Sequence, residues 1–132
     1  MANDGLHLST SISASAMQAQ SERLRFVSEN IANTDTPGYR RKLTTFEAVV
    51  ASGQKSGQVS VGPVKLDQSQ LERIFDPTHP LASEDGYYDG SNVNLVVEIA
   101  DAREAQRSYE ANLRMFDQAR KMRSGLLDLL RR

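Results

Sequence analysis

The sequence contains no cysteine, and aromatic residues make up only 6% of its 132 residues. The absence of cysteine excludes disulfide bonds and thiolate metal sites. The hydrophobic fraction of 39% is also low, because soluble domains usually approach one half. A charged fraction of 25% with a net charge of -1 is nevertheless not the profile of a disordered chain. We interpret the composition as that of a protein that folds but shares much of its buried surface with partner chains.

Long apolar runs and an excess of one charge are also missing. No stretch of about 18 apolar residues occurs, so we expect no membrane-spanning segment. Polar and charged residues interrupt the first thirty positions throughout, and we expect no cleaved signal peptide there. Sixteen basic residues stand against seventeen acidic ones. This balance argues against a non-specific nucleic-acid binder, which usually has a clear basic excess.

No group of residues is typical of a catalytic, metal or cofactor site. His7 and His79, the only histidines, lie far apart in the sequence. Asp76, Glu84 and Asp85 lie near His79, but their spacing matches no metal motif, so we favour a loop-structuring role. Neither a glycine-rich phosphate loop in a strand-to-helix context nor a Gly-x-Ser-x-Gly motif is present. We therefore expect a protein that is not an enzyme, with no metal and no cofactor.

Residues 1–38 are predicted to form a helix, roughly from Asp4 to Asn33, followed by a turn. The helical stretch has no proline and, after Gly5, no glycine. Pro37-Gly38 suits the two central positions of a type II turn, where proline presets the first φ and glycine accepts the positive second φ. Two neighbouring stripes with heptad spacing include Ile12, Met17, Leu24, Val27 and Ile31.

Residues 39–90 are frequently interrupted by glycine and proline. Short runs with β-like composition occur at 43–50, 58–66 and 71–75. We expect a small antiparallel hairpin unit or an extended arm. For the basic cluster at 40–42 we favour a solvated strand start over binding to nucleic acid or acidic lipid. Contact with acidic residues of an adjacent subunit is a third interpretation.

Residues 91–132 are predicted to form the longest helix, a rod of about 60 Å for about forty residues. Ser91, Asn92 and Asn94 are candidate N-caps. The apolar residues on its heptad grid include Leu95, Ile99, Tyr109, Leu113, Phe116, Leu127 and Leu130. We expect a mainly α fold in which this helix and the N-terminal helix pack as an antiparallel coiled-coil-like pair in one domain. Because the pair buries one face of each helix, the remaining apolar positions predict contacts with other chains.

A family resemblance is carried by residues 28–39, Ser-Glu-Asn-Ile-Ala-Asn-Thr-Asp-Thr-Pro-Gly-Tyr, which resemble the signature of flagellar rod and hook proteins. The segments 76–80, 85–87 and 92–94 resemble the region before the last helix in the FlgC type of proximal rod protein, and 107–112 resembles a motif within that helix. The positions that match the family motifs are Asn30, Asn33, Thr36, Pro37, Gly38, Tyr39, Asn92, Asn94 and Asn112.

The resemblance implies a structural subunit of the bacterial flagellar proximal rod, located in the periplasmic part of the basal body. It also implies export through the flagellar type III apparatus without a cleaved signal, and assembly with other rod proteins on the inner-membrane ring and export-gate base. Lateral helix packing would then build a hollow, torque-transmitting helical array. The rival interpretations are a cytoplasmic coiled-coil adaptor or export chaperone and, less favoured, a DNA-binding regulator that uses the basic C-terminal end.

Overall fold

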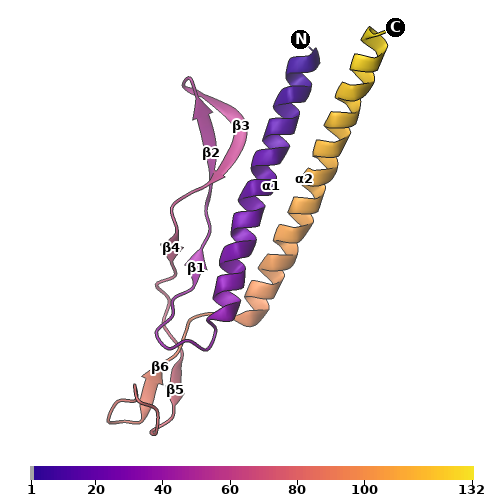
Figure 1. Ribbon diagram of the computed structural model, residues 1–132. Coiled ribbons are helices and arrows are strands. Elements are labelled where there is room, and N and C mark those ends of the chain that lie inside the picture. The colour runs from indigo at the N-terminus through magenta and orange to yellow at the C-terminus, as the bar shows by residue number, and fades with distance from the viewer. Residues whose placement is uncertain (1) are drawn as a thin grey trace.

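The computed structural model describes the backbone of residues 2–132 and the side chains from residue 4 onward. Two long helices, α1 (Ala2–Ala32) and α2 (Leu95–Leu130), lie side by side and antiparallel, with short strands between them in sequence (Figure 1). Both termini lie at the same end of the helix pair. This arrangement confirms the predicted fold class, two terminal helices packed together with a small β insert.

The helix boundaries follow from local chemistry. After α1, the Tyr39 amide donates to the Thr36 carbonyl at 3.2 Å and Gly38 has a φ of 73°, as expected for a turn centred on Pro37-Gly38. Of the three candidate caps for α2, the structure uses Asn94, whose side chain accepts hydrogen bonds from the amides of the second and third helical residues. The second helix therefore begins at Leu95, later than residue 91.

The seam between α1 and α2 is lined by small side chains. On the α2 side of this seam, Ala105 and Ala119 are 0–4% exposed. On α1, Ala19, Phe26 and Val27 are also buried, and Ala19 lines a depression together with residues 59–61 of the insert. Small residues allow two helix backbones to approach closely. The heptad grid placed large apolar residues along the predicted seam, whereas the structure places alanines there and leaves most of the large residues of α2 exposed.

A β-ribbon runs alongside α1 (Figure 1). Its strands are β2 (Phe46–Ala51) and β3 (Gln54–Val61), which pair antiparallel around a two-residue turn in which both φ angles are positive, the type I′ geometry of tight hairpins. The Val59 amide donates to the Ser15 hydroxyl at 3.2 Å, which ties the ribbon to α1. Gly57 lies over α1, where an added Cβ would come within 2.8 Å of the Ile12 side chain. The ribbon therefore packs closely on the helix.

Two shorter strand pairs complete the insert. Strands β1 (Lys42–Leu43) and β4 (Lys65–Leu66) pair near the base of the helices, and β5 (Arg73–Phe75) pairs with β6 (Tyr87–Asp89). Strand β6 was not among the segments with β-like composition that were predicted to form strands. The segment from β5 to β6, residues 73–89, is called the tip lobe below. It projects beyond the ends of the helix pair, away from both termini (Figure 1).

His79 organises the loop of the tip lobe. Its ring stacks on Tyr88 with a centroid separation of 3.9 Å, and its Nδ1 atom accepts a hydrogen bond from the Leu81 amide at 3.1 Å. These contacts confirm the loop-structuring role predicted for this histidine. In residues 2–132, no helix is both long enough and apolar enough to cross a membrane.

Candidate assembly surfaces and polar junction

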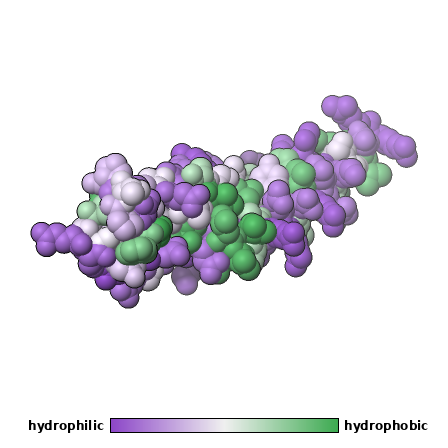
Figure 2. All heavy atoms as spheres, turned by 90° about the horizontal axis from the view of Figure 1, so that it is seen from below, coloured by the Kyte–Doolittle hydropathy of each residue, from purple (hydrophilic) through white to green (hydrophobic). Residues whose placement is uncertain are grey.

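The exposed surface is unusually large and apolar for a chain of this size. The accessible area is 9306 Å², whereas a compact protein of 14.6 kDa exposes about 6,900 Å². Among the described residues, 21 large hydrophobic side chains are exposed, while only five apolar residues are fully buried and three of these are alanines. Figure 2, seen from below, shows a continuous apolar patch near the middle of the view. The monomer therefore leaves much of its apolar surface uncovered.

The residues predicted to form stripes differ in how they are placed. Val27 is 3% exposed and packs inside the chain, so its side chain is not available to a second chain. Ile12, Met17, Leu24 and Phe116 are half-buried. The other members are 36–82% exposed: Ile31, Leu95, Ile99, Tyr109, Leu113, Leu127 and Leu130.

The two helices together form one apolar hollow on their surface. Leu24 of α1 and Tyr109 and Leu113 of α2 line a depression of about 390 Å³. Leu24 belongs to a predicted stripe of the N-terminal helix, whereas Tyr109 and Leu113 belong to the grid of the C-terminal helix, and the fold brings them together. A side chain from another molecule can enter this hollow without displacing the seam.

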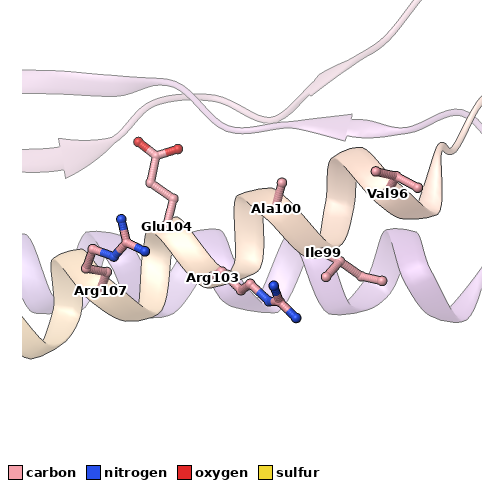
Figure 3. A pocket seen from close by; sticks show the side chains of 6 residues that line it. All are labelled: Val96, Ile99, Ala100, Arg103, Glu104 and Arg107. Atoms are coloured by element: carbon pink, nitrogen blue, oxygen red, sulfur yellow. The ribbon is translucent and has the colours of Figure 1, made fainter.

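A second depression lies on α2 alone and is called the α2 groove. It has a volume of about 570 Å³. Figure 3 shows its apolar residues toward the start of α2 and its two arginines further along the helix. The lining residues are Val96, Ile99, Ala100, Arg103, Glu104 and Arg107.

A buried hydrogen-bond network centres on Asn30, at the end of α1. The Asn30 side chain is 1% exposed. Its Oδ1 atom accepts from the Lys42 amide at 2.9 Å and from the Tyr39 hydroxyl at 2.8 Å. Its Nδ2 group donates to the Lys42 carbonyl at 3.0 Å and to the Glu98 carboxylate at 3.3 Å. All the hydrogen-bonding capacity of an asparagine amide is thereby used, and the network joins α1, β1 and the first turn of α2.

A buried ion pair completes this network. The Glu98 side chain is 0% exposed and accepts a hydrogen bond from the Arg41 guanidinium, which is 21% exposed. Sequence reasoning missed this acid. The spacing in the sequence does indicate that Glu98 is buried. Glu98, Ala102 and Ala105 follow one another at spacings of four and three residues, so they lie on the same face of the helix. That face is the buried one.

The neighbouring basic residues are also bound within the chain. Arg40 donates to the carbonyl of Ser69 at 3.1 Å, and Lys42 pairs with Glu29. The Lys42 ammonium lowers the pKa of the Glu29 carboxyl, and the same bond raises the pKa of Lys42. Burial raises the pKa of the Tyr39 hydroxyl. The favoured interpretation of 40–42 as a solvated strand start is therefore wrong, because Arg41 and Lys42 bind carboxylates of the two helices and Arg40 binds carbonyls within the insert.

Asn92 links the same region to the β1–β4 pair. Its Oδ1 atom accepts from the Arg41 amide at 2.6 Å, and its Nδ2 group donates to the Asp67 carbonyl at 2.9 Å. We call the whole network the polar junction. Its members are Glu29, Asn30, Tyr39, Arg41, Lys42, Asn92 and Glu98.

The remaining family-motif residues have local roles. Asn33 donates to the Glu29 carbonyl at 2.8 Å and accepts from the Thr36 hydroxyl at 3.0 Å, which shapes the turn after α1. Asn112 donates to the Ser108 carbonyl one turn earlier and lies outside the polar junction. Across the described part of the chain, every buried side-chain nitrogen or oxygen has a partner, and no three His, Asp or Glu residues are grouped as a metal site would need.

Two family models match this chain. The model described as flagella basal body rod protein matches residues 11–40, which include most of α1 and the following turn. The model described as flagellar basal body rod FlgEFG protein C-terminal matches residues 84–129, which include β6 and nearly all of α2. Both matches therefore contain residues of the polar junction.

Curated relatives match most of the chain. Flagellar basal-body rod protein FlgC of Agrobacterium fabrum is 40% identical over 97% of each chain. FlgC of Salmonella typhimurium is 35% identical over 84% of this chain and 87% of the relative, and FlgC of Bacillus subtilis is 33% identical over 80% and 85%. The chain belongs to the FlgC family of flagellar basal-body rod proteins.

Proposed function

We propose that this chain is a structural subunit of the proximal rod of the bacterial flagellum and that it assembles by lateral helix packing. The observation that carries the proposal is the exposure of the large apolar residues on α2. Such surfaces mark sites of protein association when they are this extensive. Family membership supplies the kind of partner, namely other rod proteins and further copies of the chain.

Several faces of α2 are available to neighbours. Leu95, Val96 and Val97 are consecutive, so they point in directions about 100° apart around the helix, and they are 45%, 77% and 47% exposed. A coiled-coil adaptor or export chaperone that forms a small closed oligomer needs one apolar stripe. Apolar residues on several faces favour a subunit surrounded by neighbours, as in a tube wall.

The helix pair has the length and the attachment that a torque-bearing element requires. At 1.5 Å per residue, α1 and α2 extend about 46 Å and 54 Å, so contacts along them resist shear jointly. The polar junction attaches the β insert to the base of this pair through hydrogen bonds and ion pairs centred on the buried side chains of Asn30 and Glu98. Force applied to the insert is therefore transmitted to the helices through a rigid joint. No catalytic step is part of this function.

The proposed location is the periplasmic part of the basal body, between the inner-membrane ring with its export gate and the distal rod. The chain would reach it through the type III export apparatus. The shaft would be hollow and helical, because a non-closing head-to-tail contact between identical subunits generates a helix instead of a ring. We infer no contact with nucleic acid and no direct span of the membrane.

Electron microscopy of basal bodies tests the proposal. In a strain lacking only this gene, we expect inner-membrane rings that carry no complete rod, and we expect the rod to return when the gene is supplied. Intact rods in the deletion strain would overturn the proposed function. If rods stay absent after complementation, the defect lies in another gene, and this result would equally overturn the proposed function.

A further inference from the structure

The tip lobe displays apolar side chains on an ordered support. Phe75 and Tyr87 face each other across β5 and β6 with ring centroids 5.0 Å apart, yet they are 62% and 38% exposed. Leu81, in the loop between these strands, is 64% exposed. The Asp76 amide donates to the Gly86 carbonyl at 2.9 Å, which closes the base of the loop. Exposed aromatic residues held in one geometry are typical of the centre of protein interfaces.

The tip lobe is also acidic. From Asp76 to Asp89 it contains four carboxylates and neither lysine nor arginine. The one arginine of the lobe, Arg73, is bound to Asp85 at 2.8 Å and so does not offset the remaining acids. Glu84 is exposed beside this pair. The lobe therefore combines an apolar centre with a negative rim.

The α2 groove has the complementary character. Val96 and Ile99 are 77% and 46% exposed, and the neighbouring Ala100 adds little bulk. Arg103 and Arg107 are exposed, and within the described residues neither has a carboxylate within 4 Å. Figure 3 shows Arg103 next to Ile99 and Arg107 about one turn further along the helix. The groove thus offers an apolar floor with two unpaired positive charges, together with the Glu104 carboxylate, which lies 3.5 Å from Arg23.

These two surfaces do not meet within one molecule. The tip lobe projects past the base of the helix pair, whereas the α2 groove lies along the first turns of α2 (Figure 1). We propose that the tip lobe of one copy docks into the α2 groove of a neighbouring copy, with Phe75, Leu81 and Tyr87 on the apolar floor and the acidic rim near Arg103 and Arg107. This inference rests on the proposed function, because neighbouring copies exist only where the chain assembles.

The contact is heterologous, since it joins two different surfaces. A docked pair therefore still has one free tip lobe and one free groove, and the contact propagates from copy to copy. Opposite charges at its rim fix the register between neighbours more than they add affinity. The contact supplements helix packing, because a lobe of this size covers less area than a stable interface needs by itself.

Site-specific cross-linking tests the contact, and the chain is suited to it because it has no cysteine of its own. Leu81→Cys and Ala100→Cys, carrying different tags, are expressed together in a strain lacking the native gene, and purified basal bodies are oxidised mildly. A disulfide forms readily only when the two Cα atoms lie within about 7 Å. We expect a mixed dimer containing both tags, and no dimer from either variant alone.

A matched control uses Ala111→Cys in place of Ala100→Cys. Ala111 is exposed on the same face of α2, three turns or about 16 Å further along the helix. We expect at least about tenfold less mixed dimer with this control. Arg103→Glu combined with Arg107→Glu is expected to reduce the Leu81–Ala100 dimer about tenfold through like-charge repulsion, and adding Glu84→Arg to restore part of it.

The outcomes separate the contact from the general function. Motile cells that give no mixed dimer, or as much dimer at Ala111 as at Ala100, would overturn the proposed contact and leave the rod function intact. If Leu81→Cys impairs motility, Glu84→Cys with Arg103→Cys tests the same contact at two exposed polar positions. Complete rods in cells lacking the gene would instead overturn the rod function itself.

Discussion

The carboxylate of Glu98 is completely buried, and its charged partner is the guanidinium of Arg41, 57 positions earlier in the chain. A buried ion pair contributes little net stability, because removing both charges from water costs about as much as their attraction returns. The pair instead fixes one position of the β insert on the two helices. If the insert shifts on the helices, the Glu98 carboxylate loses its cation in a place that water does not reach.

Removing one partner should therefore open the polar junction. Arg41→Met leaves a buried carboxylate unpaired, which typically costs about 3 kcal/mol or more. The Lys42 amide reports on the junction because it donates to Asn30. We expect its hydrogen exchange to accelerate by about 100-fold. The double variant Arg41→Met with Glu98→Leu removes both charges and should recover most of the protection; equal exchange in the single and double variants would contradict this account.

Replacing Asn30 should reduce the protection of the junction from hydrogen exchange far more than replacing an asparagine with one local hydrogen bond. Asn30→Ala leaves the Lys42 amide and carbonyl without their partner, at a cost of about 2 kcal/mol. We expect Lys42 amide exchange to be about 30-fold faster. Asn112→Ala is the matched control, since Asn112 bonds only to the Ser108 carbonyl of its own helix. Similar losses of protection in both variants would argue against a special role for the junction.

A charge in the hollow between the helices should block assembly. Leu113 is 41% exposed and lines the depression with Leu24 and Tyr109. The monomer therefore tolerates Leu113→Asp, whereas an interface with another subunit at this depression does not. We expect a soluble, secreted chain, no complete rods and no motility. Gln118→Asp, at an exposed polar position of the same helix, should leave motility intact. Normal swimming of the Leu113→Asp strain would count against this surface.

The tip lobe has a titration that can be followed directly. Hydrogen bonds from Ser83 and then Arg73 lower the pKa of Asp85 from 3.8 to about 2. Because the folded pKa is depressed, this group stabilises the lobe above pH 3.8, and the contribution is lost as the pH falls from 3.8 toward 2. We expect Ser83→Ala to raise the pKa of Asp85 in a carboxyl NMR titration.

The control for this titration is Thr78→Ala. The Thr78 hydroxyl lowers the pKa of Asp76 in the same way, so this variant should raise the pKa of Asp76 and leave Asp85 unchanged. A midpoint near 3.8 for Asp85 in the parent protein would show that its carboxylate is not bound as described.

The free monomer should be only partly helical. Most of the stability of an amphipathic helix comes from packing of its apolar face, and here much of that face on helices of 31 and 36 residues lacks a partner within the chain. At high dilution we expect far-ultraviolet circular dichroism well below the signal of these 67 residues, with a broad thermal transition. Full helicity and a cooperative transition in dilute monomer would contradict this expectation.

Much of the fold could be predicted because its signals are local. The turn after α1 depends on Pro37-Gly38, and the start of α2 depends on Asn94 as its cap. Strand β6 escaped prediction because it has three residues and is defined mainly by its pairing with β5 across a loop. Pairing partners that are distant in sequence leave no periodic pattern in either segment.

The candidate site was less predictable for a related reason. Heptad spacing identifies apolar residues but does not tell which face meets the chain's own helix and which meets a neighbour. Here Ala105 and Ala119 form the internal seam, and Leu113 lies outside it. The burial of Glu98 depended on a cation supplied by a different element, and Arg41 was interpreted as solvated because its partner was unknown.

The antiparallel pairing of α1 with α2 also determines when the chain can fold. A polypeptide that emerges N-terminus first, from a ribosome or from a narrow conduit, presents α1 long before its partner, because Arg23 pairs with Asp101 and Asn30 with Glu98. Until the last third of the chain has emerged, the first helix has no seam to close and the junction has no acid to bind Arg41. The topology therefore delays closure of the helix pair until most of the chain has emerged.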